Sequence, residues 1–164
     1  MKNHPVAGNP LATAGVDGQA GDMGTIIEPA LADRLRGERN VWLCTLRPDG
    51  SPHVTPVWFV HTGETFWISS GVRNVKVRNI INDPRVSLAL EDGDEPAVAE
   101  GQARVHHGPL RTDVLAAIAA KYDGWDAAAE VHPFGARVLV EVPVTRWLLT
   151  SGPTTTLPKV DQPS

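Results

Sequence analysis

The alternation of short β-rich runs with polar turns is the feature that most narrows what this chain can fold into. Seven such runs follow one another, at residues 41–46, 53–60, 65–70, 85–91, 97–106, 136–142 and 145–150. Most are joined by short turns. Strands and helices do not alternate regularly along the chain, which disfavours a parallel dinucleotide-binding domain. We therefore predict a mainly β (α+β) fold, an antiparallel barrel with helices at its ends.

Two or three segments between the runs have helical patterns. Pro29 opens the first, in which apolar residues recur every four positions until Gly37. The second covers 74–82 and the third, rich in alanine, covers 109–122. Residues 47–50, Arg-Pro-Asp-Gly, are a turn sequence that predicts a hairpin between the first two β-rich runs.

The two ends of the chain lack helical or strand periodicity. Residues 1–25 are rich in glycine and alanine, and residues 152–164 contain three prolines and three consecutive threonines. Such composition is typical of flexible segments. We predict one folded domain over 26–151, between a flexible N-terminal arm and a flexible C-terminal tail.

Charge and cysteine content exclude several partners and sites. The 164 residues carry 15 Lys and Arg against 19 Asp and Glu, and this net charge of -4 disfavours a nucleic-acid partner. No stretch resembles a signal peptide or is long enough to span a bilayer, so a soluble cytoplasmic protein without a membrane partner is expected. The single cysteine, Cys44, is expected to be a small buried side chain.

Familiar catalytic motifs are missing from the sequence. It has no Gly-x-Ser-x-Gly elbow, Walker loop, His-Glu-x-x-His or Cys/His cluster, so hydrolase and metalloenzyme functions lose support. The neighbouring His106 and His107 would point to opposite sides of a strand and cannot easily share a metal. We expect no metal site, and no residue has a strong claim to be the catalytic acid or base.

Residues 69–79 run from the end of a predicted strand into the first turn of a predicted helix. Ser69 and Ser70, a glycine, free helix amides and Lys76 are together the ingredients of a phosphate cradle. Lys76 lies at the edge of the apolar helix face, whereas Arg78 points the other way. The same residue types also occur at helix starts as caps and solvated charges, so this pattern leaves both interpretations open.

A second candidate is the run 55–59, which contains Pro56. Proline removes an N–H from the ladder and marks an edge or an irregular place, where backbone groups stay free for a ligand. Trp58 then serves either as a core residue or as the wall of a pocket for a flat ring.

Three blocks, taken in order, resemble a known family: 43–59, 76–88 and 100–103. They are similar to the pyridoxamine 5'-phosphate oxidase-like split β-barrel superfamily, and within it to an actinobacterial branch of probable deazaflavin (coenzyme F420)-dependent oxidoreductases. The resemblance implies a Greek-key, FMN-binding split barrel of six to seven antiparallel strands with two to three helices. It also implies a homodimer with two cofactor sites at the subunit interface.

The resemblance also implies cofactor-binding residues. The isoalloxazine or deazaflavin ring would be lined by the strand of Thr55, Pro56, Val57 and Trp58. Ser69 and Ser70 would meet the ribityl and phosphate region, and Lys76 would bind the phosphate. Asn79 matches a Lys-x-x-Asn pattern, and Trp147 would reach the cofactor from the second subunit.

The sequence departs from the true pyridoxamine phosphate oxidases at cationic positions. Those enzymes carry Arg, Lys and Arg where this chain has Thr55, Val60 and Val75, and an Arg after the late tryptophan where it has Leu148. Losing groups that hold FMN and vitamin phosphates disfavours that activity and favours F420 over FMN.

The function implied is therefore an oxidoreductase in which reduced F420 gives a hydride to a small unsaturated or conjugated organic substrate. Two alternatives remain open. One is an FMN-dependent oxidoreductase on the same fold, and the other is a non-enzymatic protein that binds a flavin, haem or tetrapyrrole.

Overall fold

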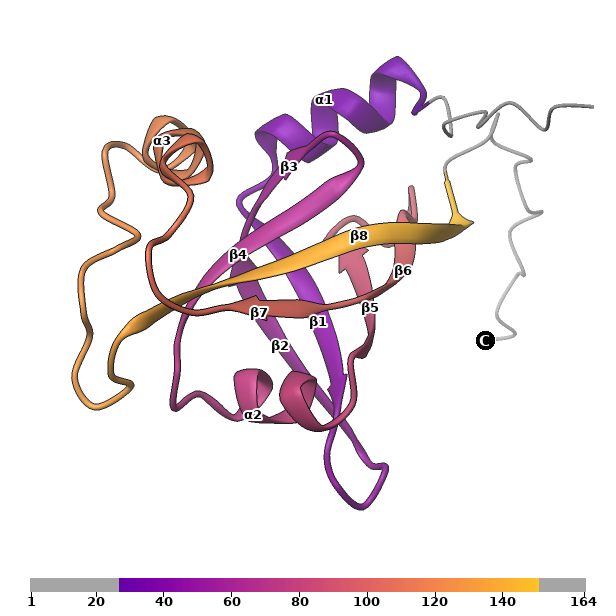
Figure 1. Ribbon diagram of the computed structural model, residues 1–164. Coiled ribbons are helices and arrows are strands. Elements are labelled where there is room, and N and C mark those ends of the chain that lie inside the picture. Colours follow the sequence, from indigo (N-terminus) through magenta and orange to yellow (C-terminus); the bar gives the residue numbers. More distant parts are fainter. Residues whose placement is uncertain (1–26, 151–164) are drawn as a thin grey trace, which may run out of the picture.

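The computed structural model describes residues 27–150, which form a strongly curled antiparallel sheet with three helices (Figure 1). The strands are β1 (Asn40–Leu46), β2 (Pro52–Trp58), β3 (Val60–Thr62), β4 (Thr65–Gly71), β5 (Arg85–Leu90), β6 (Val98–Gln102), β7 (Arg104–His106) and β8 (Arg137–Leu149). The helices are α1 (Pro29–Gly37), α2 (Val75–Asn82) and α3 (Thr112–Lys121). The predicted arm and tail lie outside the described residues.

The order of the strands makes the sheet a split barrel. They follow one another as β2-β1-β5-β6-β8-β4-β3, and β7 pairs with β8 off this path. Only Phe59 separates β2 from β3 along the chain, yet these strands are the two edges of the sheet, so the sheet curls round until its edges come near each other. This confirms the predicted antiparallel split barrel with helices at its ends.

The period-two pattern of β1 decides which side chains fill the barrel. Val41, Leu43 and Thr45 are fully buried, because they point inward. Trp42 and Cys44 alternate with them and point outward. The prediction for Cys44 was wrong: its side chain is half-buried on the outer face, because the period places it opposite the core positions.

Three predicted strand boundaries were also wrong, two of them because of a distant contact. The run 53–60 breaks at Phe59, whose N–H and C=O both bond to the Tyr122 hydroxyl, at 2.7 and 2.8 Å. The run 97–106 breaks at Ala103, whose N–H donates to the Pro84 carbonyl at 2.8 Å. The last two predicted runs are one strand, β8.

Gly101 lets β8 pass from one wall of the barrel to the other. A Cβ at this position would lie 2.4 Å from the carbonyl oxygen of Pro143, which is closer than any real contact. The register of β6 against β8 shifts at the same place. The close approach of the two backbones therefore requires glycine here.

Two apolar clusters hold these elements together. The first fills the barrel with side chains from most strands, and Leu31 and Leu35 of α1 close its end. The second lies between the outside of the barrel and α3, where Trp67 and Leu139 pack on Val114 and Ile118. The barrel therefore has α1 and α3 towards one end and α2 at the other (Figure 1).

Candidate functional site

The turn between β4 and α2, predicted to be a phosphate cradle, offers fewer free amides than its sequence indicates. Three of its amides already donate to backbone carbonyls, those of Val72, Arg73 and Asn74. Loop 134–136 supplies two of the acceptors. The amides of Val75 and Lys76 at the start of α2 have no hydrogen-bond partner within residues 27–150. They leave a smaller cradle, with its N–H groups on the first turn of the helix.

Loop 134–136 is held against this turn by a glycine. A Cβ on Gly71 would lie 2.4 Å from the Cβ of Phe134 and 2.7 Å from its carbonyl oxygen. Only glycine lets the two segments approach this closely. The loop therefore forms one fixed wall beside the start of α2.

Lys76 is a half-buried cation on that first turn of α2. Burial lowers the pKa of its ammonium group, and no carboxylate within the described residues forms an ion pair with it. A charged group in this position is stabilised by an anion that replaces the lost water. Arg78, two residues later, is exposed, as the helical pattern predicts.

The inner face of β2 carries two polar atoms that lack partners. His53 and Thr55 pair with Thr45 and Leu43 of β1, so all four point into the barrel. His53 Nδ1 and Thr55 Oγ1 are buried, and neither finds a hydrogen-bond partner in the part of the chain that the structure describes. Buried polar groups normally have partners, so both are open to a ligand or an ordered water.

His53 is a site residue that the sequence reasoning missed. Its pKa is lowered by burial first, and then by repulsion from Arg47 and Lys76. The signal was present in the sequence, because His53 precedes Thr55 by two residues on a strand and so shares its face.

The four residues predicted to line a ring divide between the two faces of β2. Thr55 and Val57 point inward, whereas Pro56 and Trp58 point outward. The Trp58 ring stacks on Tyr122, with 4.5 Å between centroids and 4° between planes, and its edge meets Trp125 at 5.3 Å. A flat ring lying on one face of β2 can touch only one pair of these side chains.

The two serines of β4 also diverge. Ser69 Oγ donates to the carbonyl of Ala127 at 2.7 Å, on the side of the barrel that faces α3. Ser70 is buried and accepts a hydrogen bond from the Asn74 side chain at 3.0 Å, next to the start of α2. Ser70, rather than Ser69, therefore contacts the start of α2.

Asn79 lies on α2 next to this group, whereas Trp147 lies apart from it. Asn79 is buried and its side-chain amide donates to Thr45 Oγ1 at 3.0 Å, a contact that fastens α2 to β1. Trp147 lies eight residues beyond Leu139, the β8 residue that pairs with Ser69, which corresponds to about 26 Å along a strand. Its ring is near Phe66, with centroids 6.1 Å apart. Ser70 and Lys76 therefore lie at the start of α2, His53 and Thr55 lie on the inner face of β2, and Trp147 lies further along β8.

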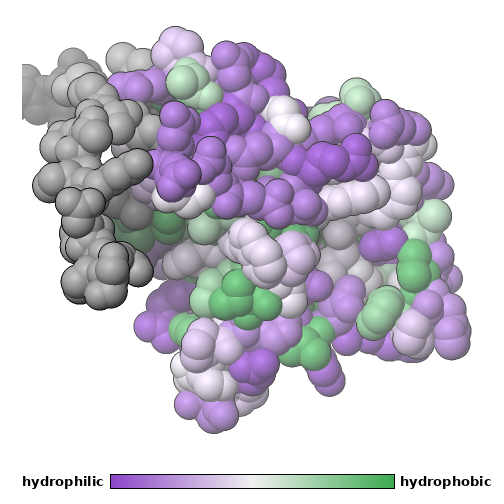
Figure 2. All heavy atoms as spheres, turned by 180° about the vertical axis from the view of Figure 1, so that it is seen from behind, coloured by the Kyte–Doolittle hydropathy of each residue, from purple (hydrophilic) through white to green (hydrophobic). Residues whose placement is uncertain are grey.

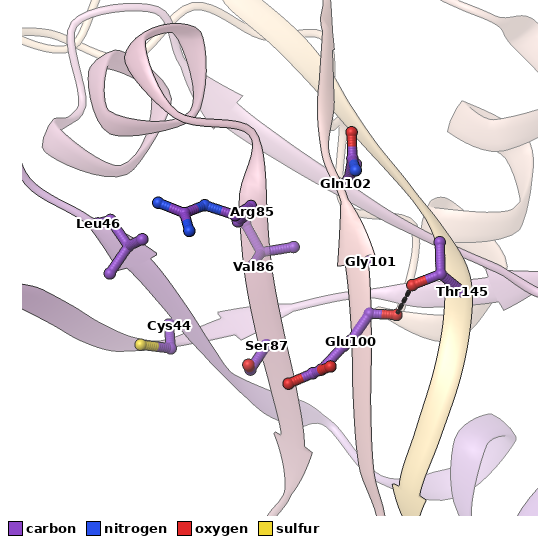
Figure 3. A pocket seen from close by; sticks show the side chains of 9 residues that line it. All are labelled: Cys44, Leu46, Arg85, Val86, Ser87, Glu100, Gly101, Gln102 and Thr145. Atoms are coloured by element: carbon purple, nitrogen blue, oxygen red, sulfur yellow. Dashed lines mark hydrogen bonds between the residues drawn. The ribbon is translucent and has the colours of Figure 1, made fainter. Parts of the chain in front are cut away.

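A separate groove of about 330 Å³ lies on the outer face of the sheet (Figure 3). Its lining comes from β1, β5, β6 and β8, and Thr145 Oγ1 donates to the Glu100 carbonyl at 3.0 Å across it. None of the predicted cofactor residues lines this groove. Within residues 27–150, no group of three or more His, Cys, Asp or Glu is arranged to hold a metal ion. None of the helices described is both long and apolar enough to cross a membrane.

Comparison with known proteins gives one family match. The sequence profile of the family described as pyridoxamine 5'-phosphate oxidase matches residues 27–151. No curated protein sequence gives a significant match.

Solved structures with the same architecture include two of about one-quarter identity. The conserved hypothetical protein Rv2991 from Mycobacterium tuberculosis is 26% identical with a TM-score of 0.59, and the match covers 74% of this chain and 83% of that one. A protein named F420 reductase is 25% identical with a TM-score of 0.56, covering 70% and 94%. The haem storage protein HutZ from Vibrio cholerae, 17% identical with a TM-score of 0.61 and coverage of 75% and 94%, shows likeness of fold alone.

Proposed function

This chain belongs to the pyridoxamine 5'-phosphate oxidase family, and from that premise we propose that it is an F420-dependent oxidoreductase. The substrate class is a small unsaturated or conjugated organic molecule that accepts a hydride. The similarity to a protein named F420 reductase supports the choice of cofactor. The absence of the family's additional phosphate-binding cations, at Thr55, Val60 and Val75, supports it against FMN.

The observation that carries the proposal is the unpaired cation at the start of α2. Lys76 has no acidic partner within residues 27–150, two helix amides lie beside it, and His53 and Thr55 leave buried polar atoms without partners. A phosphate fits Lys76 and the two helix amides, because it accepts hydrogen bonds from the amides and neutralises the ammonium group. An elongated cofactor could then extend along β2 from Lys76 towards Thr55.

The protein's contribution to the reaction is to bind and orient the cofactor. When bound, the deazaflavin supplies the hydride chemistry itself. Lys76 and the amides of α2 would hold its phosphate, and the β2 edge strand would fix the orientation of its ring. No described residue has a clear claim to be a general acid, so the proton would come from solvent.

The proposal includes a homodimer, because one chain leaves the site incomplete. Trp147 lies too far along β8 to reach the start of α2 in its own chain. The outer face of β1 and β2 is apolar, with Trp42 42% exposed and Val54 53% exposed. The β1–β2 hairpin lies behind β8 in Figure 1, and the view from behind carries hydrophobic patches in its lower half (Figure 2). A second copy packed on this face would bury these side chains.

The dimer predicts a change in sedimentation. Val54→Lys should convert a wild-type dimer into a monomer, because it places a charge in the buried interface. Ile81→Lys is the matched control, since Ile81 is also an exposed aliphatic residue, 62% exposed on α2, and it should leave the dimer intact. If Val54→Lys also remains dimeric, the interface lies elsewhere.

The choice of cofactor predicts an order of affinities. Titration of the full chain with F420 and with FMN, followed by fluorescence, should show F420 binding at least about tenfold more tightly. Tight FMN binding with weak F420 binding would instead support an FMN-dependent oxidoreductase. Failure of both ligands to bind would rule out both enzymes.

Turnover separates the enzyme from a binding protein. Reduced F420 should be consumed under anaerobic conditions when a conjugated acceptor is added, and the rate should saturate with acceptor. If F420 binds tightly but no acceptor from a broad panel is reduced, the protein is a carrier of the cofactor rather than an oxidoreductase.

A further inference from the structure

A second cleft, of about 560 Å³, lies at the opposite end of the barrel from α2. It opens between the C-terminal end of α1, the edge strand β3 and the last turns of α3. Its volume falls within the usual range of small-molecule sites. The cleft is independent of the cofactor site proposed above, since neither Lys76 nor any other predicted cofactor residue lines it.

The charged side chains in the lining are all basic. Arg36, Arg39 and Lys121 line the cleft together with His61, and no Asp or Glu is among the lining residues. The two arginines form exposed ion pairs with acids outside the cleft, Arg36 with Asp33 and Arg39 with Asp123 at 3.7 Å. Exposed pairs of this kind are weak, so both guanidinium groups remain available to an anion.

Lys121 is the cation best placed to anchor a ligand. Its Nζ lies 3.0 Å from the Leu35 carbonyl and 3.6 Å from the centre of the Phe59 ring. An ammonium group has three N–H donors, and these two contacts leave one free. Glu38 is the acid whose charge raises the pKa of Lys121, but its carboxylate is already bound by Arg34 at 2.6 Å.

His61 adds a second polar group that lacks a partner. Its Nε2 is buried and has no hydrogen-bond partner among the residues that the structure describes. Burial and the repulsion of Lys121 lower its pKa to about 4, so the imidazole is neutral at neutral pH. Its ring packs against Phe66, with 4.8 Å between centroids, so the neutral imidazole adds no charge to the cleft.

The remaining walls are apolar. Leu35 and Val60 lie on one side, and Ala117 and Ala120 of α3 lie on the other. An ammonium and two guanidinium groups beside such walls match a molecule with one acidic group and a hydrocarbon body. We propose that this cleft binds a small organic carboxylate, with the carboxylate on Lys121 and the apolar body against α3.

The test compares a carboxylate with its uncharged equivalent. The full chain is titrated with 2-naphthoate and with 2-naphthamide, and binding is followed by ¹H–¹⁵N NMR shifts. The carboxylate should saturate and move the signals of β3 and of the ends of α1 and α3, while the amide should bind at least about tenfold more weakly. Equal binding of the two probes, or no saturable shift in these elements, would overturn the proposal.

Two variants and a control test which residues bind naphthoate, and one of the variants leaves the contact of Lys121 with α1 in place. Lys121→Met should weaken naphthoate binding about tenfold, but it also removes the contact with Leu35 and could disturb α1. Ala120→Phe fills the cleft from an exposed position without changing charge, and it should abolish binding. Arg111→Gln, at the start of the same helix and outside the cleft, is the control and should bind as the wild type does. Full binding by Ala120→Phe would also overturn the proposal.

The pH dependence of binding gives an independent readout. Burial lowers the pKa of Lys121 to about 8, against the opposing effect of Glu38. His61 stays neutral between pH 7 and 9, and the other charged groups that face Lys121 are Arg36 and Arg39 of the lining and Glu38 of α1's end. Naphthoate affinity should therefore fall about tenfold between pH 7 and pH 9, as the ammonium loses its proton. An unchanged affinity would show that Lys121 is not the anchor.

Discussion

Replacing Lys76 with methionine is expected to weaken F420 binding by about 10- to 100-fold. A charge-assisted hydrogen bond in a partly buried place contributes about 1.5–3 kcal/mol, which corresponds to this range of affinity. Methionine keeps the aliphatic body of the side chain, so the packing of α2 on the barrel should survive. Fluorescence titration of F420 against the purified variant measures the loss.

The matched control is Arg78→Met, which removes an equal charge two residues further along α2. Arg78 is exposed on the other side of the helix, so its loss should change F420 affinity less than threefold, an effect well under about 1 kcal/mol. The Lys76 variant should be no less stable than the wild type, because burial lowers the pKa of Lys76 and so makes its charged form unfavourable in the fold. A stable Lys76→Met protein that binds F420 normally would place the phosphate elsewhere.

The lowered pKa of Lys76 also predicts how this lysine changes the free energy of unfolding as the pH varies. A lysine whose pKa is lower in the folded state destabilises the fold while it is protonated. That cost disappears as the pH rises through the interval between its lowered pKa and its ordinary one. In Lys76→Met this contribution is absent, which distinguishes burial of the charge from a general loss of packing.

Local patterns were sufficient to predict most of the fold. Alternating β-rich runs, the Arg-Pro-Asp-Gly turn and the helix opened by Pro29 depend on residues close in sequence, and all are present in the structure. The boundaries that differed depend on distant groups. Phe59 leaves the ladder because the hydroxyl of Tyr122, 63 residues away, bonds its backbone, and no local pattern records that contact.

The candidate site was only partly predictable for similar reasons. The phosphate pattern identified Lys76, because its features lie within one short segment. The loss of two turn amides to loop 134–136 could not be seen, since that loop is more than 60 residues away in sequence. The division of Thr55–Trp58 between two faces was within reach, because a strand alternates its side chains and the neighbouring β1 shows which face is buried.

Tyr122→Phe is expected to lower the free energy of unfolding by about 2–4 kcal/mol, a large effect for the loss of one oxygen atom. The hydroxyl accepts the N–H of Phe59 and lies 2.8 Å from the carbonyls of both Phe59 and Arg39. Phenylalanine leaves these groups unpartnered at the junction of β2 and β3, where Phe59 is fully buried. Each unsatisfied buried backbone group costs about 1–3 kcal/mol. Urea unfolding with an unchanged m-value measures the difference.

The Tyr122→Phe variant measures the contribution of the hydroxyl group alone. Phenylalanine retains the ring that stacks on Trp58, so any loss reports the hydroxyl and not the stacking. Thr145→Val is the control, because it removes an exposed hydroxyl that donates to Glu100 at 3.0 Å and that water can replace, and it should cost less than about 0.5 kcal/mol. If the two variants lose similar stability, water reaches the β2–β3 junction and Tyr122 does not hold the barrel edges together. If only Tyr122→Phe is destabilised, a single side chain just after α3 supplies the hydrogen bonds that two sheet edges cannot make with each other.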